Sequence, residues 1–184
     1  MEKLVIIPTY NEKENINNIL HAIFNLNDGF HVLVIDDGSP DGTAQIVREL
    51  IPKFSGKLFI EERTGKLGLG TAYIHGFKWA IEKGYQFIFE IDADFSHNPN
   101  DLPKLYNACK NEGADVAVGS RYIKGGGVVN WPINRIALSK GASLYTRMIT
   151  WMPVKDPTAG FVCYKKEVLE TINLDEIRFV GYAC

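Results

Sequence analysis

The sequence contains few cysteines, no long apolar run and no excess of basic charge. Its three cysteines show no CxxC spacing, which argues against a zinc site or a disulfide framework and favours reduced thiols in a cytoplasmic compartment. The longest apolar runs, such as residues 4–8 and 32–35, are strand-sized, whereas a membrane-spanning helix needs about 20 apolar residues. Met1 is followed directly by a strand pattern, so we expect no secretory signal. The 20 basic and 22 acidic residues give a net charge of -2, so we expect no nucleic-acid partner.

The length of 184 residues suffices for one domain but not for two of ordinary size. Hydrophobic residues make up 46% of the sequence and charged residues 23%, a balance typical of a globular protein. The last four residues, 181–184, stop within what reads as a structural element, without a helix end or a polar tail. We therefore expect a single domain over residues 1–184 that is truncated on its C-terminal side.

Short strands alternate with amphipathic helices through the first 120 residues. Strands are predicted over residues 3–8, 31–35, 57–61, 85–91 and 115–119, and helices over 14–26, 44–51, 72–83 and from 99 onward. This alternation predicts an α/β fold with a mostly parallel sheet flanked by helices. Ligands of such sheets bind beyond the carboxyl ends of the strands, so function is expected in the loops that follow the strands.

The pattern changes after residue 120. Residues 125–127 are three glycines that predict a loop, the basic and aromatic stretch 134–151 predicts a helix, and a strand over 161–164 and a helix over 165–172 follow. Arg121, just past the fifth strand, could reach a diphosphate with a bidentate guanidinium fork. The basic residues beyond it could bind a second phosphate or an anionic membrane surface, or form a solvated helix face. These residues are Lys124, Arg135, Lys140 and Arg147.

The loop after the first strand, residues 8–12, reads Pro-Thr-Tyr-Asn-Glu. It contains no glycine, which excludes a dinucleotide-binding fingerprint at the position where that fold needs it. Its tyrosine and polar side chains could offer an aromatic wall and polar edges to a planar base. Alternatively, Thr9 or Asn11 caps the next helix by accepting from free amides. The glycine-rich residues 65–70 match neither a Walker A loop nor GxGxxG.

Two adjacent carboxylates, Asp36 and Asp37, follow the second strand. Neighbouring side chains at a strand end point in different directions, so at most one of the two lines a given face of a pocket. That carboxylate could accept hydrogen bonds from a nucleobase edge or a ribose. The alternative is a turn and helix cap, for which the Asp, Gly, Ser and Pro residues of 36–43 are well suited.

A second pair of carboxylates, Asp92 and Asp94, follows the buried fourth strand. In extended backbone the two would share a face about 6 to 7 Å apart, where they repel each other unless a cation lies between them. Magnesium commonly takes one or two carboxylates together with waters and substrate phosphates. The pair therefore predicts half of a metal site that a diphosphate would complete. Ser96 could add a hydroxyl, and His97 is interpreted as structural.

Seven stretches in this order resemble family 2 glycosyltransferases with the nucleotide-sugar-binding GT-A fold. The chain is similar, more narrowly, to the dolichyl-phosphate and polyprenyl-phosphate β-mannosyltransferases. The resemblance covers essentially the whole chain and is most specific in GKLGLGTAY and GGGVVNWP. The stretches are VIIPTYNEKEN (5–15), VLVIDDGSPDGT (32–43), GKLGLGTAY (65–73), DADFSHNP (92–99), GSRY (119–122), GGGVVNWP (125–132) and DPTAGFVCY (156–164).

The resemblance implies transfer of mannose from GDP-mannose to a polyprenyl or dolichyl phosphate, by a peripheral enzyme on the cytoplasmic face of a membrane. Guanosine is implied to be held by Pro8, Tyr10, Glu12, Ile35 and Asp37. The diphosphate and a Mg²⁺ or Mn²⁺ ion are implied to face Asp92, Ala93 and Asp94, with Ser96 as a further metal ligand. The implied catalytic residues are Asp94 and Arg121, the latter through phosphate or sugar.

The implied reaction inverts the anomeric centre and needs no catalytic histidine. Its nucleophile is a phosphate monoester with a second pKa near 6, which is largely dianionic at neutral pH. Three other hypotheses remain open at this point. The chain could transfer another sugar, from UDP-glucose or UDP-GlcNAc, to a lipid phosphate. It could bind a nucleotide without catalysis, or it could be a phospho-acceptor receiver domain.

Overall fold

The computed structural model of the protein describes residues 1–120, 156 and 159–177. The predicted strands and helices that fall within these residues are present, with small shifts at their ends. The strands are β1 (Lys3–Thr9), β2 (His31–Asp36), β3 (Leu58–Glu62), β4 (Phe87–Glu90), β5 (Val116–Val118) and β6 (Val162–Lys165). The helices are α1 (Ile16–Phe24), α2 (Thr43–Leu50), α3 (Leu69–Glu82), the 3₁₀ turn η1 (Pro99–Asp101), α4 (Leu102–Lys110) and α6 (Lys166–Thr171).

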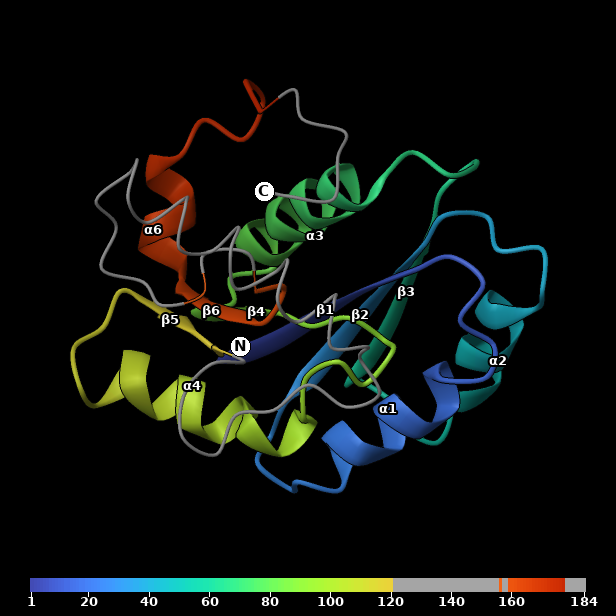
Figure 1. The fold of residues 1–184 in the computed structure, drawn as a ribbon, viewed down its shortest axis with the longest axis horizontal. Helices are drawn as coiled ribbons and strands as arrows, with labels where there is room; N and C mark the ends of the chain where they lie inside the picture. The colour runs from blue at the N-terminus through green and yellow to red at the C-terminus, as the bar shows by residue number, and fades with distance from the viewer. Residues whose placement is uncertain (121–155, 157–158, 178–184) are drawn as a thin grey trace, which may run out of the picture.

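The strands of the described residues form one six-stranded sheet in the order β3-β2-β1-β4-β6-β5 (Figure 1). The first four pair in parallel, which confirms the predicted mostly parallel sheet. The place of the last two strands was not predicted. β6 lies between β4 and β5 and pairs antiparallel with both, so β5 does not extend the parallel series directly.

Apolar side chains cover the two faces of this sheet in two separate clusters. Along β1, Val5 and Ile7 belong to the cluster packed by α1, α2 and α4, while Leu4 and Ile6 belong to the one packed by α3 and α6. Figure 1 shows the same division, with α3 and α6 on one side of the sheet and α1, α2 and α4 on the other. Strands buried on both faces need apolar residues at every position, which explains the unbroken apolar runs in the sequence.

Helix α3 packs closely against the sheet because Gly76 faces it. A Cβ atom at position 76 would lie 2.8 Å from Cγ2 of Ile6 and 2.9 Å from Cδ1 of Ile35. Only a residue without a side chain lets the helix backbone approach this far. The close approach fixes α3 over the strands whose carboxyl ends carry the predicted site.

Several predictions concern residues outside the described part of the chain. These are the glycine loop 125–127, the helix 134–151 and the chain end at 181–184. The basic residues Arg121, Lys124, Arg135, Lys140 and Arg147 also lie outside it. Among the described residues, no helix has both the length and the apolar character that crossing a bilayer requires.

Candidate functional site

The carboxyl ends of β1, β2, β3 and β4 lie side by side because these four strands run parallel. The loops that follow them span residues 10–15, 37–42, 63–68 and 91–98. The first three loops are joined by hydrogen bonds and one ion pair, and the fourth carries Asp92 and Asp94. The sequence-predicted site residues of the described part all lie on these loops or on the strand ends beneath them.

The β1–α1 loop is held in place by the β2–α2 loop. Three consecutive backbone amides, those of residues 11, 12 and 13, donate hydrogen bonds to side-chain oxygens of Ser39, Thr43 and Asp41, in that order. Each of the three bonds is 3.0 Å long. Two side chains of the β2–α2 loop and Thr43, the first residue of α2, thus satisfy backbone amides of the β1–α1 loop. The arrangement leaves Tyr10 37% exposed at the carboxyl edge of the sheet, where its ring can stack against a planar group.

The carboxylate of Asp36 forms hydrogen bonds with other groups of the protein through both of its oxygens. Its Oδ1 accepts hydrogen bonds from the hydroxyls of Thr9 at 2.8 Å and Ser39 at 2.6 Å, and its Oδ2 accepts from the Ser39 amide at 2.8 Å. Asp36 is buried, so these bonds replace the water that its charge would otherwise need. The turn interpretation therefore holds for Asp36. The alternative in which Thr9 or Asn11 caps the next helix is wrong, because the N-cap of α1 is Asn15 and no side chain caps it.

Asp37 forms a buried ion pair with Arg63, which follows β3. Arg63 donates from Nε at 2.6 Å and approaches with Nη2 at 2.5 Å, both to Asp37 Oδ1. The other oxygen, Oδ2, accepts from the amides of Leu67 at 3.0 Å and Gly68 at 3.3 Å. The exposed fractions of the two side chains are 7% for Asp37 and 9% for Arg63. Asp37 therefore fastens the β3–α3 loop over the end of β2.

Arg63 also connects this loop to the first turn of α3. Its Nη1 donates to the Thr71 hydroxyl at 2.8 Å, and its Nη2 donates to the Gly68 carbonyl at 3.2 Å. Arg63 was not among the residues predicted from the sequence. The sequence did contain a signal for it. Arg63 is a basic residue just after the third strand, and two adjacent carboxylates, Asp36 and Asp37, follow the second strand.

Asp92, two residues past the end of β4, is approached closely from two sides. The Tyr73 hydroxyl, from α3, donates to its Oδ1 at 3.1 Å. On the other side, a Cβ atom at Gly160 would lie 3.0 Å from its Oδ2. Burial, reinforced by the nearby charge of Asp92, raises the pKa of Tyr73 well above its usual value, so its hydroxyl stays a donor. The pKa of Glu90 is also raised, to about 8, mainly by burial and to a smaller extent by the nearby charge of Asp92.

Asp94 lies in a turn rather than in extended backbone. Strand β4 ends at Glu90, so the expected extended geometry of residues 92–94 is wrong. Asp94 is exposed, and its two oxygens accept from the Ser96 amide at 2.9 Å and the Ser96 hydroxyl at 2.8 Å. Between them, Phe95 has φ 58°, a left-handed conformation that is strained for a bulky residue. Strained backbone persists only where the surrounding structure enforces it, and it is common at functional sites.

The oxygen atoms of Asp92, Asp94 and Ser96 are of the type that Mg²⁺ and Mn²⁺ prefer. In the described part of the chain, no group of three or more His, Cys, Asp or Glu side chains could hold a metal by itself. Two carboxylates and a hydroxyl suit an ion that keeps its remaining places for waters and substrate phosphates. The donor set therefore fits a divalent ion that binds together with a diphosphate.

The other predicted residues divide between surface and interior. Glu12 is half-buried at the edge of the sheet, and its carboxylate accepts from the Asn15 side chain at 2.9 Å. Pro8, Ile35 and Ala93 are buried. His97 is buried too, with its ring 5.2 Å from that of Phe161, a position that agrees with a structural role.

Comparison with known proteins identifies the family. The profile of glycosyl transferase family 2 matches residues 4–172, almost the whole chain. The chain belongs to this family. Membership excludes the receiver-domain hypothesis and places the carboxyl-edge loops in a glycosyltransferase.

Three curated members of the family are similar over nearly all of this chain. The polyprenol monophosphomannose synthase of Mycolicibacterium smegmatis is 46% identical over 97% of the chain and 67% of its own length. The undecaprenyl-phosphate mannosyltransferase of Micrococcus luteus is 42% identical over 99% of the chain and 74% of its own length. The dolichol-phosphate mannosyltransferase of Pyrococcus furiosus is 44% identical over 97% of the chain and 50% of its own length. The chain thus spans between half and three quarters of these relatives.

Solved structures of other glycosyltransferases share the fold. The glucosyl-3-phosphoglycerate synthase of Mycobacterium tuberculosis, solved with UDP, has a TM-score of 0.64 at 19% identity, covering 91% of this chain and 57% of that one. A mannosyltransferase of Pyrobaculum calidifontis, solved with GDP-Man and Mn²⁺, has a TM-score of 0.60 at 20% identity, covering 92% and 46%. These similarities and the sheet topology confirm the predicted GT-A-like α/β fold.

Proposed function

We propose that the protein transfers mannose from GDP-mannose to a polyprenyl or dolichyl phosphate, with inversion at the anomeric carbon. The observation that carries this proposal is the 42–46% identity, over nearly the whole chain, to three mannosyltransferases of lipid phosphates. The acceptor is a membrane lipid, so the proposal includes peripheral binding at the cytoplasmic face of a membrane. Residues 1–184 are proposed to form, or to belong to, one catalytic domain.

The guanosine is proposed to bind at the carboxyl ends of β1 and β2. The exposed ring of Tyr10 provides a surface for stacking, and Glu12 beside it is half-buried with a carboxylate that can accept from a base. The side chain of Ile35 is buried under Gly76, so Ile35 and the buried Pro8 would meet the nucleotide mainly through the backbone. Asp37 supports the pocket by fixing the β3–α3 loop.

Asp92, Asp94 and Ser96 are proposed to hold Mg²⁺ or Mn²⁺, with Ala93 placing the two carboxylates around the diphosphate. When bound, the ion supplies Lewis-acid stabilisation of the charge on the GDP leaving group. The Tyr73 hydroxyl keeps the Asp92 carboxylate from rotating, and the Ser96 amide and hydroxyl do the same for Asp94. These contacts arrange both carboxylates before the substrate arrives.

Two further roles complete the proposal. The guanidinium of Arg121 is proposed to bind phosphate or sugar with a bidentate fork, and Asp94 and Arg121 are the proposed catalytic residues. The acceptor phosphate is mostly dianionic at neutral pH, so it attacks the anomeric carbon without a general base. The buried His97 therefore has no catalytic task in the proposed reaction.

Donor selectivity tests the proposal. With Mn²⁺ present, calorimetry should show binding of GDP-mannose, with UDP-glucose and UDP-GlcNAc binding at least about tenfold more weakly, because a site built for one base leaves its polar groups unpaired with another. Transfer of radiolabelled mannose to a short polyprenyl phosphate should follow the same donor order. Preference for a UDP-sugar would contradict the assigned donor, and binding without transfer would support the non-catalytic alternative.

A further inference from the structure

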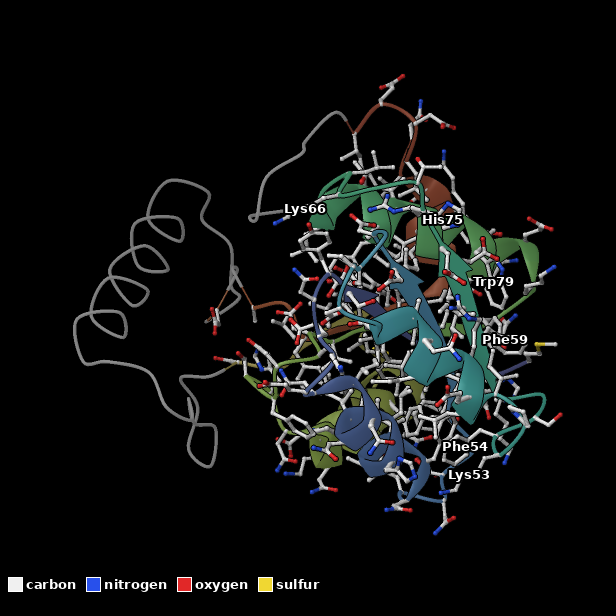
Figure 2. All side chains as sticks on the ribbon, turned by 90° about the vertical axis from the view of Figure 1, so that its right-hand side faces the viewer. Lys53, Phe54, Phe59, Lys66, His75 and Trp79 are labelled. Carbon is white, nitrogen blue, oxygen red and sulfur yellow. The ribbon has the colours of Figure 1, made fainter. Side chains whose placement is uncertain are left out.

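Lys66, at the tip of the β3–α3 loop, reaches across the carboxyl edge of the sheet to Tyr10. Strand β2 lies between β3 and β1, so the loop must bend over the end of β2 to bring the two residues together. The Lys66 ammonium lies 4.4 Å from the centre of the Tyr10 ring. In Figure 2, Lys66 lies in the upper part of the view, and Lys53, another lysine beside an aromatic ring, lies near its lower edge.

The backbone of this loop is fixed while the Lys66 side chain stays exposed. Asp37 Oδ2 holds the amides of Leu67 and Gly68, the two residues that follow Lys66. On the other side, a Cβ at Gly38 would lie 3.3 Å from Cα of Gly65, so the β2–α2 loop packs directly against this one. Within the described residues, Lys66 is exposed and has no carboxylate partner. Its ammonium can therefore move to a new partner without disturbing the loop.

The Tyr10 ring cannot hold the ammonium and a nucleobase on the same face at once. At an exposed site the attraction between an ammonium and a ring is weak, so a stacking base can displace it. A lysine ammonium is a good partner for phosphate oxygens, and pairs between opposite charges are stronger than ammonium–ring contacts. A nucleoside diphosphate carries both groups. Its base can stack on the Tyr10 ring, and its phosphates can pair with the Lys66 ammonium.

We propose that Lys66 is a donor-binding residue that leaves the Tyr10 ring when the nucleotide stacks there and then pairs with its diphosphate. The inference rests on the proposed function, because it takes a nucleoside diphosphate as the ligand of this edge. In this role, Lys66 makes the site bind a nucleoside diphosphate more tightly than the nucleoside without phosphates. The bare nucleoside must displace the ammonium and offers it nothing in return.

Isothermal calorimetry with GDP and with guanosine tests this inference on the wild-type chain and three variants. In low salt, Lys66→Ala should weaken GDP binding about tenfold, the loss of one charge-assisted contact, and should leave guanosine binding equal or tighter. Lys66→Arg keeps the charge and should stay close to wild type. Lys53→Ala is the matched control, since Lys53 also lies over a ring, at 5.5 Å from that of Phe54, and should change neither affinity.

Two results would overturn the inference while leaving the proposed function intact. One is a Lys66→Ala variant with unchanged GDP affinity, and the other is an equal loss of affinity for GDP and guanosine. A wild-type chain that bound no GDP would contradict the proposed function as well, so the two failures are distinguishable. Because the Lys66 side chain is exposed, the variants are expected to fold like wild type.

Discussion

Asp94→Ala is expected to lower the rate of mannose transfer by about 10³-fold or more while the protein stays folded. The proposed ion stabilises charge on the leaving group, a contribution of several kcal/mol to the barrier, and each 1.4 kcal/mol is a factor of ten in rate. Asp94 is exposed and bonds only to the neighbouring Ser96 among the contacts described, so its loss costs the fold little. Steady-state transfer at saturating Mn²⁺, with circular dichroism as the check on folding, measures both effects.

Asp101→Ala is the matched control for this variant. Asp101 is a carboxylate only seven positions further on, in η1, and it pairs with Lys104 at 2.6 Å on the surface. Its removal should leave transfer unchanged. A folded Asp94→Ala variant with near wild-type turnover would reject the metal-binding role of Asp94, and so would equal losses in both variants.

Asp37→Asn is expected to lower the free energy of unfolding by about 3 kcal/mol. Removing one partner of a buried ion pair leaves the other charge without compensation, and the typical cost is about 3 to 5 kcal/mol. Here the stranded charge is that of Arg63, and the amides of Leu67 and Gly68 lose a charged acceptor at the same time. Urea unfolding followed by circular dichroism measures the change.

The pair formed by Arg48 and Glu62 provides the control for this prediction. It also joins an arginine to a carboxylate close to the end of β3, but both side chains are nearly half exposed, at 45% and 46%. Exposed pairs contribute little, so Glu62→Gln should cost about 0.5 kcal/mol. An Asp37→Asn variant with wild-type stability and lost GDP binding would show instead that Asp37 acts by direct contact with the nucleotide.

The parallel part of the fold could be predicted from the sequence because its signals are local. Apolar runs the length of a strand and helical spacing between them define β1 to β4 with their helices, and this order places the loops at one edge. The position of β6 between β4 and β5 could not be predicted in the same way. It depends on pairing with strands far away in the chain, Glu90 with Val162 and Val118 with Val162, and no local pattern encodes such pairs.

The candidate site was predicted in its location more than in its detailed contacts. Carboxylates at strand ends indicated where chemistry is expected, because parallel strands bring these ends together. The partners of those carboxylates come from other loops: Arg63 for Asp37 and Tyr73 for Asp92. Alternation along a strand also fails once the strand ends, which is why the turn at Asp94 was missed. The roles of the site residues in binding and catalysis remain predictions.

A crystal soaked with GDP and Mn²⁺ tests the central claim most directly, because manganese can be located by its anomalous scattering. We expect one anomalous peak in contact with the carboxylates of Asp92 and Asp94 and with the diphosphate of a GDP molecule whose base lies against Tyr10. GDP density without a manganese peak at these two carboxylates, or a peak bound elsewhere while both side chains keep other partners, would contradict it.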